Sequence, residues 1–268
     1  VTALLVLDEP DAVDEPRVGL GFVGELHANV AHRSDQTVRS PATQLAEPLV
    51  RLEGLADLPI ALSVRPETLR ALERTDGAAA LAPIAELAAG RDLLLEPWVE
   101  LDEEAWRQVG ESDMVIAQYA EGRSTTEDLL GVSPGAVVRL DPDATPATVQ
   151  LLRAAGANLV LLDGDAVSGS TTAGDARGPV HLLDDNGVTR VALVVDDHLA
   201  TTLSGADPEL AVHRTLAELS LLLATADADH AVVVDVGSID ESTIRLLLTA
   251  MAAHRDIDVR TLPELFDT

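Results

Sequence analysis

The sequence predicts an α/β fold in which seven or eight parallel strands, each followed by a helix, form a barrel. Short runs rich in Val and Leu recur along the 268 residues, as expected for strands buried on both faces. Segments with helical spacing of apolar residues separate these runs. Several runs end on an acidic residue, and parallel strands would bring those residues to one mouth. The acidic residues at the run ends are Asp8, Glu96, Asp141, Asp163, Asp196 and Asp235.

The first half of the chain alternates between the two kinds of segment. Pro66 is placed as in the first turn of a helix, and Leu45, Leu49 and Leu52 have helical spacing. In order, we predict a strand at 2–7, an irregular stretch at 8–40, a helix at 41–55, a strand at 59–64, helices at 66–74 and 78–89, and a strand at 93–95.

The second half continues the pattern. Thr145, Pro146 and Gly156 are the N-cap, first position and C-terminal stop of a predicted helix. Asn186-Gly187 supplies the positive φ angles of a tight turn, so 180–195 is predicted to form an inserted β-hairpin. In order, we predict a helix from Asp102, a helical segment at 126–130, a strand at 136–140, a helix at 145–155, a strand at 159–162, a loop at 164–178, the hairpin, a helix at 208–226, a strand at 231–234, a helix at 242–254, and an eighth strand or closing edge at 259–262.

An open doubly wound sheet is the alternative architecture. We favour the barrel because the strand count reaches seven or eight and because no glycine-rich phosphate loop follows the first strand. Gly19, Gly21 and Gly24 do spell G-x-G-x-x-G. They follow no convincing strand and precede no clear helix, so the match is interpreted as chance.

Composition narrows the classes of partner. The net charge is −28 and all 18 cations are arginine, so the surface would repel nucleic acid and anionic membranes. No apolar run is long enough to cross a bilayer, so this segment is not expected to insert into a membrane. Aromatic residues make up only 2% of the chain, which argues against a long polysaccharide groove.

Glu96 and Trp98 form the sharpest local feature, since a carboxylate beside an aromatic ring is typical of a sugar subsite. The alternative interpretation is that Trp98 packs over the barrel end, and that acidic residues in these loops cap helices. A glycosidase would need a second carboxyl group roughly 5–10 Å away. The best catalytic candidates are Glu96, Asp163, Asp196 and Asp235. The full set of candidate ligand-binding residues is Asp8, Glu96, Trp98, Asp141, Asp163, Asp196, Asp197, His198 and Asp235.

A metal site is a further possibility at Asp196-Asp197-His198, because two carboxylates and an imidazole suit a divalent ion. A metal-dependent deacetylase would need an Asp-Asp pair near the first strand and a His-x-x-x-His pair, and neither is present. No metal or cofactor is therefore predicted. No G-x-S-x-G elbow is present, so serine catalysis is not predicted either. The other histidines are expected on the surface or on helices; they are His27, His32, His181, His213, His230 and His254.

The order of motifs between residues 55 and 265 resembles an uncharacterised actinobacterial family of exported, membrane-anchored envelope proteins. The segments that carry the resemblance are LPIALSVRPETLRAL, LLLEPWVELDEEAW, AVVRLDPDATPATVQLLRAAGANLVLLDGDAV, VALVVDDHLATTL and LAVHRTLAELSLLLA. Genes of that family tend to lie beside the MurJ/MviN-type lipid II flippase. The resemblance implies an extracytoplasmic, single-domain piece (1–268) of a longer protein, and a barrel similar to those of glycoside hydrolases and polysaccharide deacetylases. It transfers no catalytic role.

We therefore expect a catalytically silent, carbohydrate-enzyme-like barrel that binds a glycan or an envelope protein as a scaffold, in connection with cell-wall precursor export. One alternative is an active carbohydrate hydrolase or deacetylase that uses strand-end carboxylates. The other is a divalent-cation-binding module.

Overall fold

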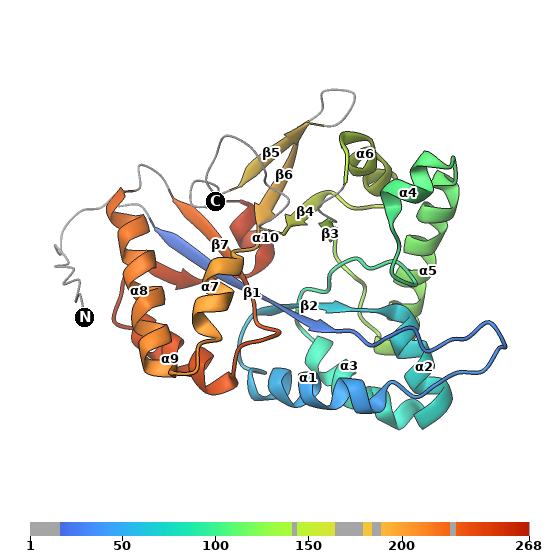
Figure 1. Cartoon of the computed structure of the whole chain (residues 1–268), viewed down its shortest axis with the longest axis horizontal. Helices are drawn as coiled ribbons and strands as arrows, with labels where there is room; N and C mark the ends of the chain where they lie inside the picture. The colour runs from blue at the N-terminus through green and yellow to red at the C-terminus, as the bar shows by residue number, and fades with distance from the viewer. Residues whose placement is uncertain (1–16, 141–143, 164–178, 184–188, 226–228, 268) are drawn as a thin grey trace.

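Two four-stranded sheets, covered on their outer faces by helices, make up the computed structural model of the chain (Figure 1). It describes residues 17–140, 144–163, 179–183, 189–225 and 229–267. The first sheet has the order β2-β1-β7, with β8 also paired to β1, and the second has the order β3-β4-β6-β5. Their bounds are β1 Val18–Leu26, β2 Ile60–Val64, β7 His230–Asp235 and β8 Ile257–Val259, then β3 Val137–Leu140, β4 Leu159–Leu162, β5 Val180–Leu183 and β6 Thr189–Val194.

The strands run in one direction, as predicted: every ladder except β5–β6 is parallel. Single parallel bridges, Leu62 with Leu93 and Val195 with Val233, join the two sheets. A backbone hydrogen bond of 2.7 Å from Leu95 N to Val137 O connects the segment that contains Leu93 to β3. The predicted strand at 93–95 thus makes a bridge and no ladder, and the sheet is not continuous around the fold as a closed barrel would require. The α/β character is confirmed.

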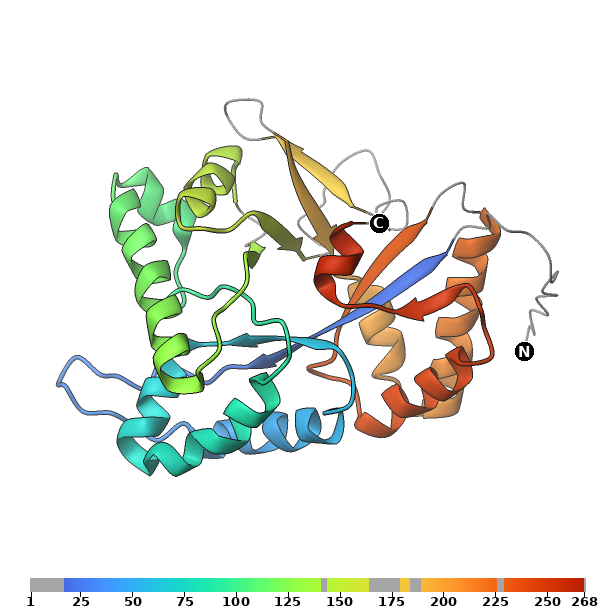
Figure 2. The same cartoon turned by 180° about the vertical axis from the view of Figure 1, so that it is seen from behind.

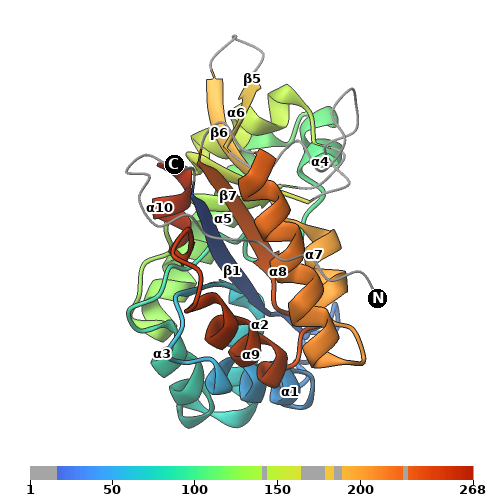
Figure 3. The same cartoon turned by 90° about the vertical axis from the view of Figure 1, so that its left-hand side faces the viewer.

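Most helices lie on the outer faces of the two sheets, and α10 lies between them. Figure 3 shows α8 to one side of β1 and β7, and α10 to the other. The helices are α1 Ala42–Gly54, α2 Pro66–Asp76, α3 Ala82–Ala88, α4 Glu103–Gln108, α5 Ser112–Leu130, α6 Pro146–Ala154, α7 Asp197–Leu203, α8 Pro208–Thr225, α9 Glu241–Met251 and α10 Leu262–Phe266, with a 3-10 turn at Ala78–Leu81. None of these described helices has both the length and the hydropathy needed to span a bilayer.

The C-terminal helix α10 fills the interior near the start of the strands. Figure 2 shows α10 between the two sheets. Leu262, Leu265 and Phe266 of α10 pack with inward-facing apolar residues. These residues come from both sheets and the 93–95 segment; they include Val23, Ala61, Leu94, Val137, Leu161, Leu193 and Val233. Because α10 and these apolar residues fill the interior near the start of the strands, polar side chains face inward at the carboxyl ends of the strands.

The prediction that residues 18–26 belong to an irregular stretch is wrong, because they form the central strand β1. Glycines hide the strand pattern, since glycine is depleted in strands. Gly21 is needed for packing: a Cβ there would lie 2.5 Å from Leu265 Cδ1 of α10. The glycine motif therefore serves helix–strand packing inside a strand, in agreement with its interpretation as a chance match. The predicted strand at 2–7 lies outside the described residues.

The remaining predictions agree in large part. Thr145 caps α6, with Pro146 at its first position, and Gly156 after its end has φ 101°. Helix α7 was not predicted, because its few residues follow directly on the apolar run of β6. Strands β5 and β6 pair antiparallel. The Asn-Gly turn and the loop at 164–178 lie outside the described residues.

Candidate functional site

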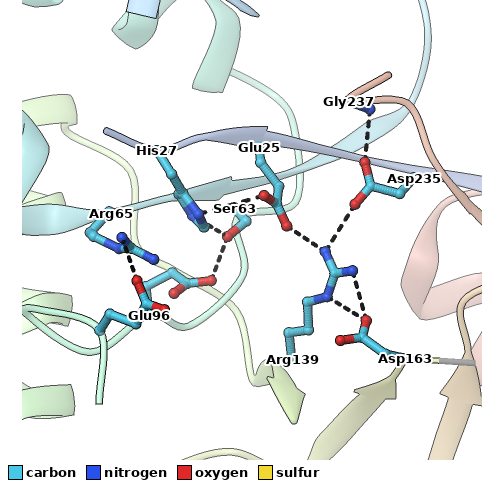
Figure 4. A network of polar contacts seen from close by, with 10 residues as sticks. Glu25, His27, Ser63, Arg65, Glu96, Arg139, Asp163, Asp235 and Gly237 are labelled. Atoms are coloured by element: carbon cyan, nitrogen blue, oxygen red, sulfur yellow. Dashed lines mark hydrogen bonds and ion pairs between the residues drawn. The ribbon is translucent and has the colours of Figure 1, made fainter. Parts of the chain in front are cut away.

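A layer of polar side chains faces inward at the carboxyl ends of the strands (Figure 4). The alternation of side chains along a strand places them there, one pleat beyond the apolar interior. The layer consists of Glu25, Ser63, Glu96, Arg139, Asp163 and Asp235. A cavity of about 320 Å³ opens onto it and is lined by five carboxyl groups and two guanidinium groups: Glu25, Glu96, Glu100, Glu103 and Asp163, with Arg65 and Arg139.

Arg139 on β3 holds three carboxylates together. Its Nε donates to Asp163 Oδ1 at 2.7 Å, and its Nη1 donates to Asp235 Oδ2 at 2.9 Å and to Glu25 Oε1. Asp235 is held in turn by the backbone N–H of Gly237 at 2.8 Å. Strands β1, β3, β4 and β7 thus meet at one guanidinium group, which draws the two sheets together.

The charges of this cluster depend on one another. Burial opposes the positive charge of Arg139, but the carboxylates of Asp163 and Glu25 outweigh it and raise the pKa of the guanidinium group. Burial and the neighbouring charge of Asp235 raise the pKa of Glu25, although Arg139 counteracts them. The cluster keeps an excess of negative charge, so it does not attract an anionic ligand.

A second set of contacts joins Glu96 to β1. Ser63 Oγ hydrogen-bonds to Glu96 Oε1 and lies 2.8 Å from His27 Nε2. The other ring nitrogen of His27, Nδ1, lies 3.6 Å from Glu25 Oε2. The contacts therefore run from Glu96 through Ser63 and His27 to Glu25, and so to Arg139 (Figure 4).

The two groups that Ser63 connects, Glu96 and His27, both have shifted pKa values. Burial raises the pKa of Glu96 to about 7, although the hydrogen bond from Ser63 and the positive charge of Arg65 lower it. Burial and the positive charges of Arg65 and Arg139 lower the pKa of His27 to about 3. At neutral pH His27 is uncharged, and a substantial fraction of Glu96 is a neutral acid able to donate a hydrogen bond.

The structure brings some predicted site residues together. Glu96 and Asp163 line the cavity, and Asp235 shares Arg139 with Asp163. Asp8 and Asp141 lie outside the described residues.

The other predicted residues lie apart from the cavity lining. Asp196 is the N-cap of α7 and accepts from Leu199 N at 2.9 Å. The alternative interpretation of Asp196, as a residue that caps a helix, is therefore the correct one. Asp197 begins α7, and His198 Nε2 lies 3.2 Å from Glu218 Oε1 on α8. Among the described residues, no three His, Asp or Glu side chains are arranged to hold a metal ion.

Trp98 packs against a loop and does not line the cavity. Its ring centroid lies 6.0 Å from that of His32, at an interplanar angle of 56°. His32 belongs to the loop after β1, which is fastened to α2 by the fully buried carboxylate of Glu67. One oxygen of Glu67 accepts from Ala31 N at 2.9 Å, His32 N at 2.8 Å and His32 Nδ1 at 2.7 Å.

Replacing Glu67 with alanine is expected to lower the free energy of unfolding by about 3 kcal/mol, because three donors lose one charged acceptor. Chemical denaturation measures the loss. The matched control is Glu73→Ala on the same helix, where the carboxylate pairs with Arg70 at a partly exposed position; a loss of about 0.5 kcal/mol is expected there. Equal losses in the two variants would contradict the assigned role of Glu67.

Sequence reasoning missed Glu25, His27, Ser63, Arg65 and Arg139. His27 was expected on the surface or on a helix, and this is wrong, because it lines the cavity. A signal was present: polar residues two apart follow the apolar part of β1 and of β2, in Glu25-x-His27 and Ser63-x-Arg65. Residues two apart on a strand point to the same side. The pattern was obscured because β1 itself was not recognised.

Comparison with known proteins finds similarity in structure and none in sequence. No protein-family description and no curated protein sequence matches the chain. Among solved structures, the chain is similar to a 4-alpha-glucanotransferase from Thermococcus litoralis, with a TM-score of 0.69 at 16% identity over 94% of this chain and 40% of that one. It is also similar to a putative polysaccharide deacetylase from Mycobacterium smegmatis, with a TM-score of 0.62 at 17% identity over 99% of this chain and 93% of that one. The alpha-amylase AmyC from Thermotoga maritima gives a TM-score of 0.66 at 10% identity over 94% of this chain and 75% of that one.

The fold thus resembles the barrels of glycoside hydrolases and polysaccharide deacetylases, as the sequence resemblance implied. The chain spans less than half of the length of the glucanotransferase. At identities of 10–17% the likeness shows the fold alone.

Proposed function

We propose that this chain is a binding domain for a neutral oligosaccharide, which it holds in the strand-end cavity without cleaving it. The observation that carries the proposal is the Arg139 cluster, which engages three carboxylates of the site in ion pairs. A guanidinium partner makes a carboxylate a poorer nucleophile and base than the same carboxylate would be without it. It still has lone pairs that can accept hydrogen bonds from hydroxyl groups.

The cavity has the size and chemistry for such a ligand. Its volume of about 320 Å³ lies at the small end of the range usual for small-molecule sites. Glu96 supplies a donor in its acid form, and Arg65, which pairs with Glu100 at 3.0 Å, lines the same cavity. The excess of carboxyl groups over cations among the lining residues disfavours acidic sugars. By resemblance of the sequence to envelope proteins, we further propose an extracytoplasmic location and a glycan or envelope-protein partner.

Binding of a neutral oligosaccharide is expected to weaken about five- to tenfold as the pH rises from 6 to 8.5. The carboxylic acid of Glu96 donates to the ligand, and this donor is lost as Glu96 ionises near pH 7. Isothermal titration calorimetry with maltotriose measures the effect; this probe is chosen because one similar structure is an alpha-glucan transferase.

The matched variant is Glu96→Gln, whose amide donates at every pH, so its affinity should not change over this range. A pH dependence that persists in Glu96→Gln would assign the effect to another group. Absence of binding to maltotriose, chitotriose and xylotriose throughout the range would overturn the proposed function.

A hydrolase is the second candidate, and the acidity of Glu96 favours it. A buried glutamic acid with a pKa of about 7 in a cavity is typical of a general acid. Asp163 lines the same cavity and would be the second carboxyl group. Chromatography of the same oligosaccharides after long incubation separates the two candidates. Products that disappear in Glu96→Gln would establish the hydrolase and refute the non-cleaving domain.

A further inference from the structure

The wall between two cavities contains a continuous set of polar contacts. A second cavity, of about 200 Å³, lies between α1 and the ends of β1 and β7. Glu25 and His27 line both cavities. Ser63 is 1% exposed and lies between His27 and Glu96.

Ser63 is poorly placed to be a nucleophile, although its contacts with His27 and Glu25 have the order of a Ser-His-acid triad. It is buried and does not line the cavity, so a ligand in the described site has no access to its hydroxyl group. Its single hydroxyl has instead two partners, Glu96 Oε1 and His27 Nε2. A hydroxyl between two such partners accepts from one and donates to the other.

We propose that Ser63 and His27 form a proton relay through which Glu96 and Glu25 share one proton. In one state of the ligand-free protein Glu96 is the acid: it donates to Ser63, Ser63 donates to His27 Nε2, and the proton of His27 lies on Nδ1, facing Glu25. In the other state the proton of Glu96 has passed to Ser63, that of Ser63 to Nε2, and that of Nδ1 to Glu25. The sum of protons and the charge are the same in both states.

The relay fits the electrostatics of its members. His27 stays neutral in both states and only changes tautomer, in accord with the burial and the two arginines that disfavour its cation. Glu25 is a suitable acceptor because burial and Asp235 raise its pKa. The last transfer requires a small rotation of the imidazole ring, because the distance of 3.6 Å between Nδ1 and Glu25 Oε2 is longer than that of a hydrogen bond.

Charged groups from several elements act on the relay. Arg65, Glu25 and Glu103 act on Glu96, and Arg65 and Arg139 act on His27. Asp235, Arg139, Asp163 and Arg65 act on Glu25. Ser63 and His27 are thus positioning residues that determine which of the two carboxyl groups is the neutral acid and which is the carboxylate that can accept from a ligand. This deepens the proposed binding function, but the relay itself needs no ligand.

The tautomer of His27 tests the relay. The ¹⁵N shifts of His27 are followed from pH 5 to pH 9 in the ligand-free protein, with its signals assigned by their absence in His27→Gln. The two states hold the same number of protons, so they interconvert at constant pH. While Glu96 and Glu25 share one proton, Nε2 and Nδ1 are both expected to have shifts between those of an acceptor and of a protonated nitrogen, because each nitrogen carries the proton in one of the states. Glu96→Gln should give a single tautomer, with one acceptor and one protonated nitrogen.

Ser63→Ala is the decisive variant, because it removes the hydroxyl and leaves the charges in place. Ser63→Ala should likewise give a single tautomer, and the intermediate shifts should return in Ser63→Thr, which keeps a hydroxyl group; circular dichroism checks that both variants fold. A wild-type His27 that keeps a single tautomer from pH 5 to pH 9 would overturn the relay, as would intermediate shifts in Ser63→Ala. Failure of the protein to bind sugar would leave these shifts unaffected, so the two proposals fail separately.

Discussion

Replacing Arg139 with methionine is expected to lower the free energy of unfolding by about 3 kcal/mol at pH 8. The guanidinium group is the shared partner of Glu25, Asp163 and Asp235, and without it these carboxylates repel one another in a partly buried layer. Methionine keeps much of the apolar stem, so the loss reports the charge. Urea denaturation followed by circular dichroism measures it.

The loss in Arg139→Met should depend on pH. Burial and Asp235 raise the pKa of Glu25 and Arg139 opposes them, so without the cation that pKa rises further above its unfolded value and the folded state binds more protons. Protonation relieves the repulsion at low pH, and the deficit relative to the wild type grows as the pH rises.

Arg245→Met is the matched control for Arg139→Met. The side chain of Arg245 is 44% exposed and pairs with Asp57 and Glu241 on the surface. A loss below about 1 kcal/mol is expected for such pairs. A loss in Arg139→Met no larger than in this control would show that the cluster does not hold the two sheets together.

Replacing Gly122 with alanine is expected to destabilise the fold by about 3 kcal/mol and to displace Glu96. Helix propensity alone favours alanine inside α5 by about 1 kcal/mol. The packing makes the net change in stability unfavourable, because a Cβ at Gly122 would lie 2.2 Å from the backbone oxygen of Glu96 and 3.0 Å from the carbonyl carbon of Pro97. Backbone atoms cannot rotate away as a side-chain end can, so the 96–98 segment has to shift.

The control for Gly122→Ala is Ser124→Ala, on the exposed face of the same helix, where propensity alone acts and a gain of a few tenths of a kcal/mol is expected. Thermal unfolding compares the two variants, and the pH midpoint of Glu96 reports the displacement. A stabilised Gly122→Ala protein with an unchanged midpoint for Glu96 would contradict the close packing of α5 on this segment.

Local patterns predicted much of the fold correctly. The apolar runs of β2, β4 and β7 and the capped helix α6 stand where the sequence indicated. Each of these features depends on residues close together in the chain: a run of buried residues, a threonine before a proline, a glycine after a helix. Strand β1 was missed because Gly19 and Gly21 are explained by the packing of α10, more than 230 residues further along the chain.

The candidate site was predictable only in part, for the same reason. Ends of apolar runs pointed to Glu96, Asp163 and Asp235, and the structure places all three in the polar layer. They did not point to Arg139 as the common partner, nor to Ser63 and His27 as the link to Glu96. A single arginine at the end of β3 has no local signature of its role.

By itself, then, the sequence determined that buried strands alternate with helices, that the strands are parallel, and that acids gather where they end. These are consequences of hydrophobic periodicity and chain connectivity, which act over a few residues. Only the tertiary structure decided which acids are neutralised by Arg139, which one is held as a neutral acid, and which merely cap a helix. Those outcomes depend on burial and on charges brought together from strands more than 100 residues apart, since a pKa is set by its surroundings in space and not by its neighbours in the chain.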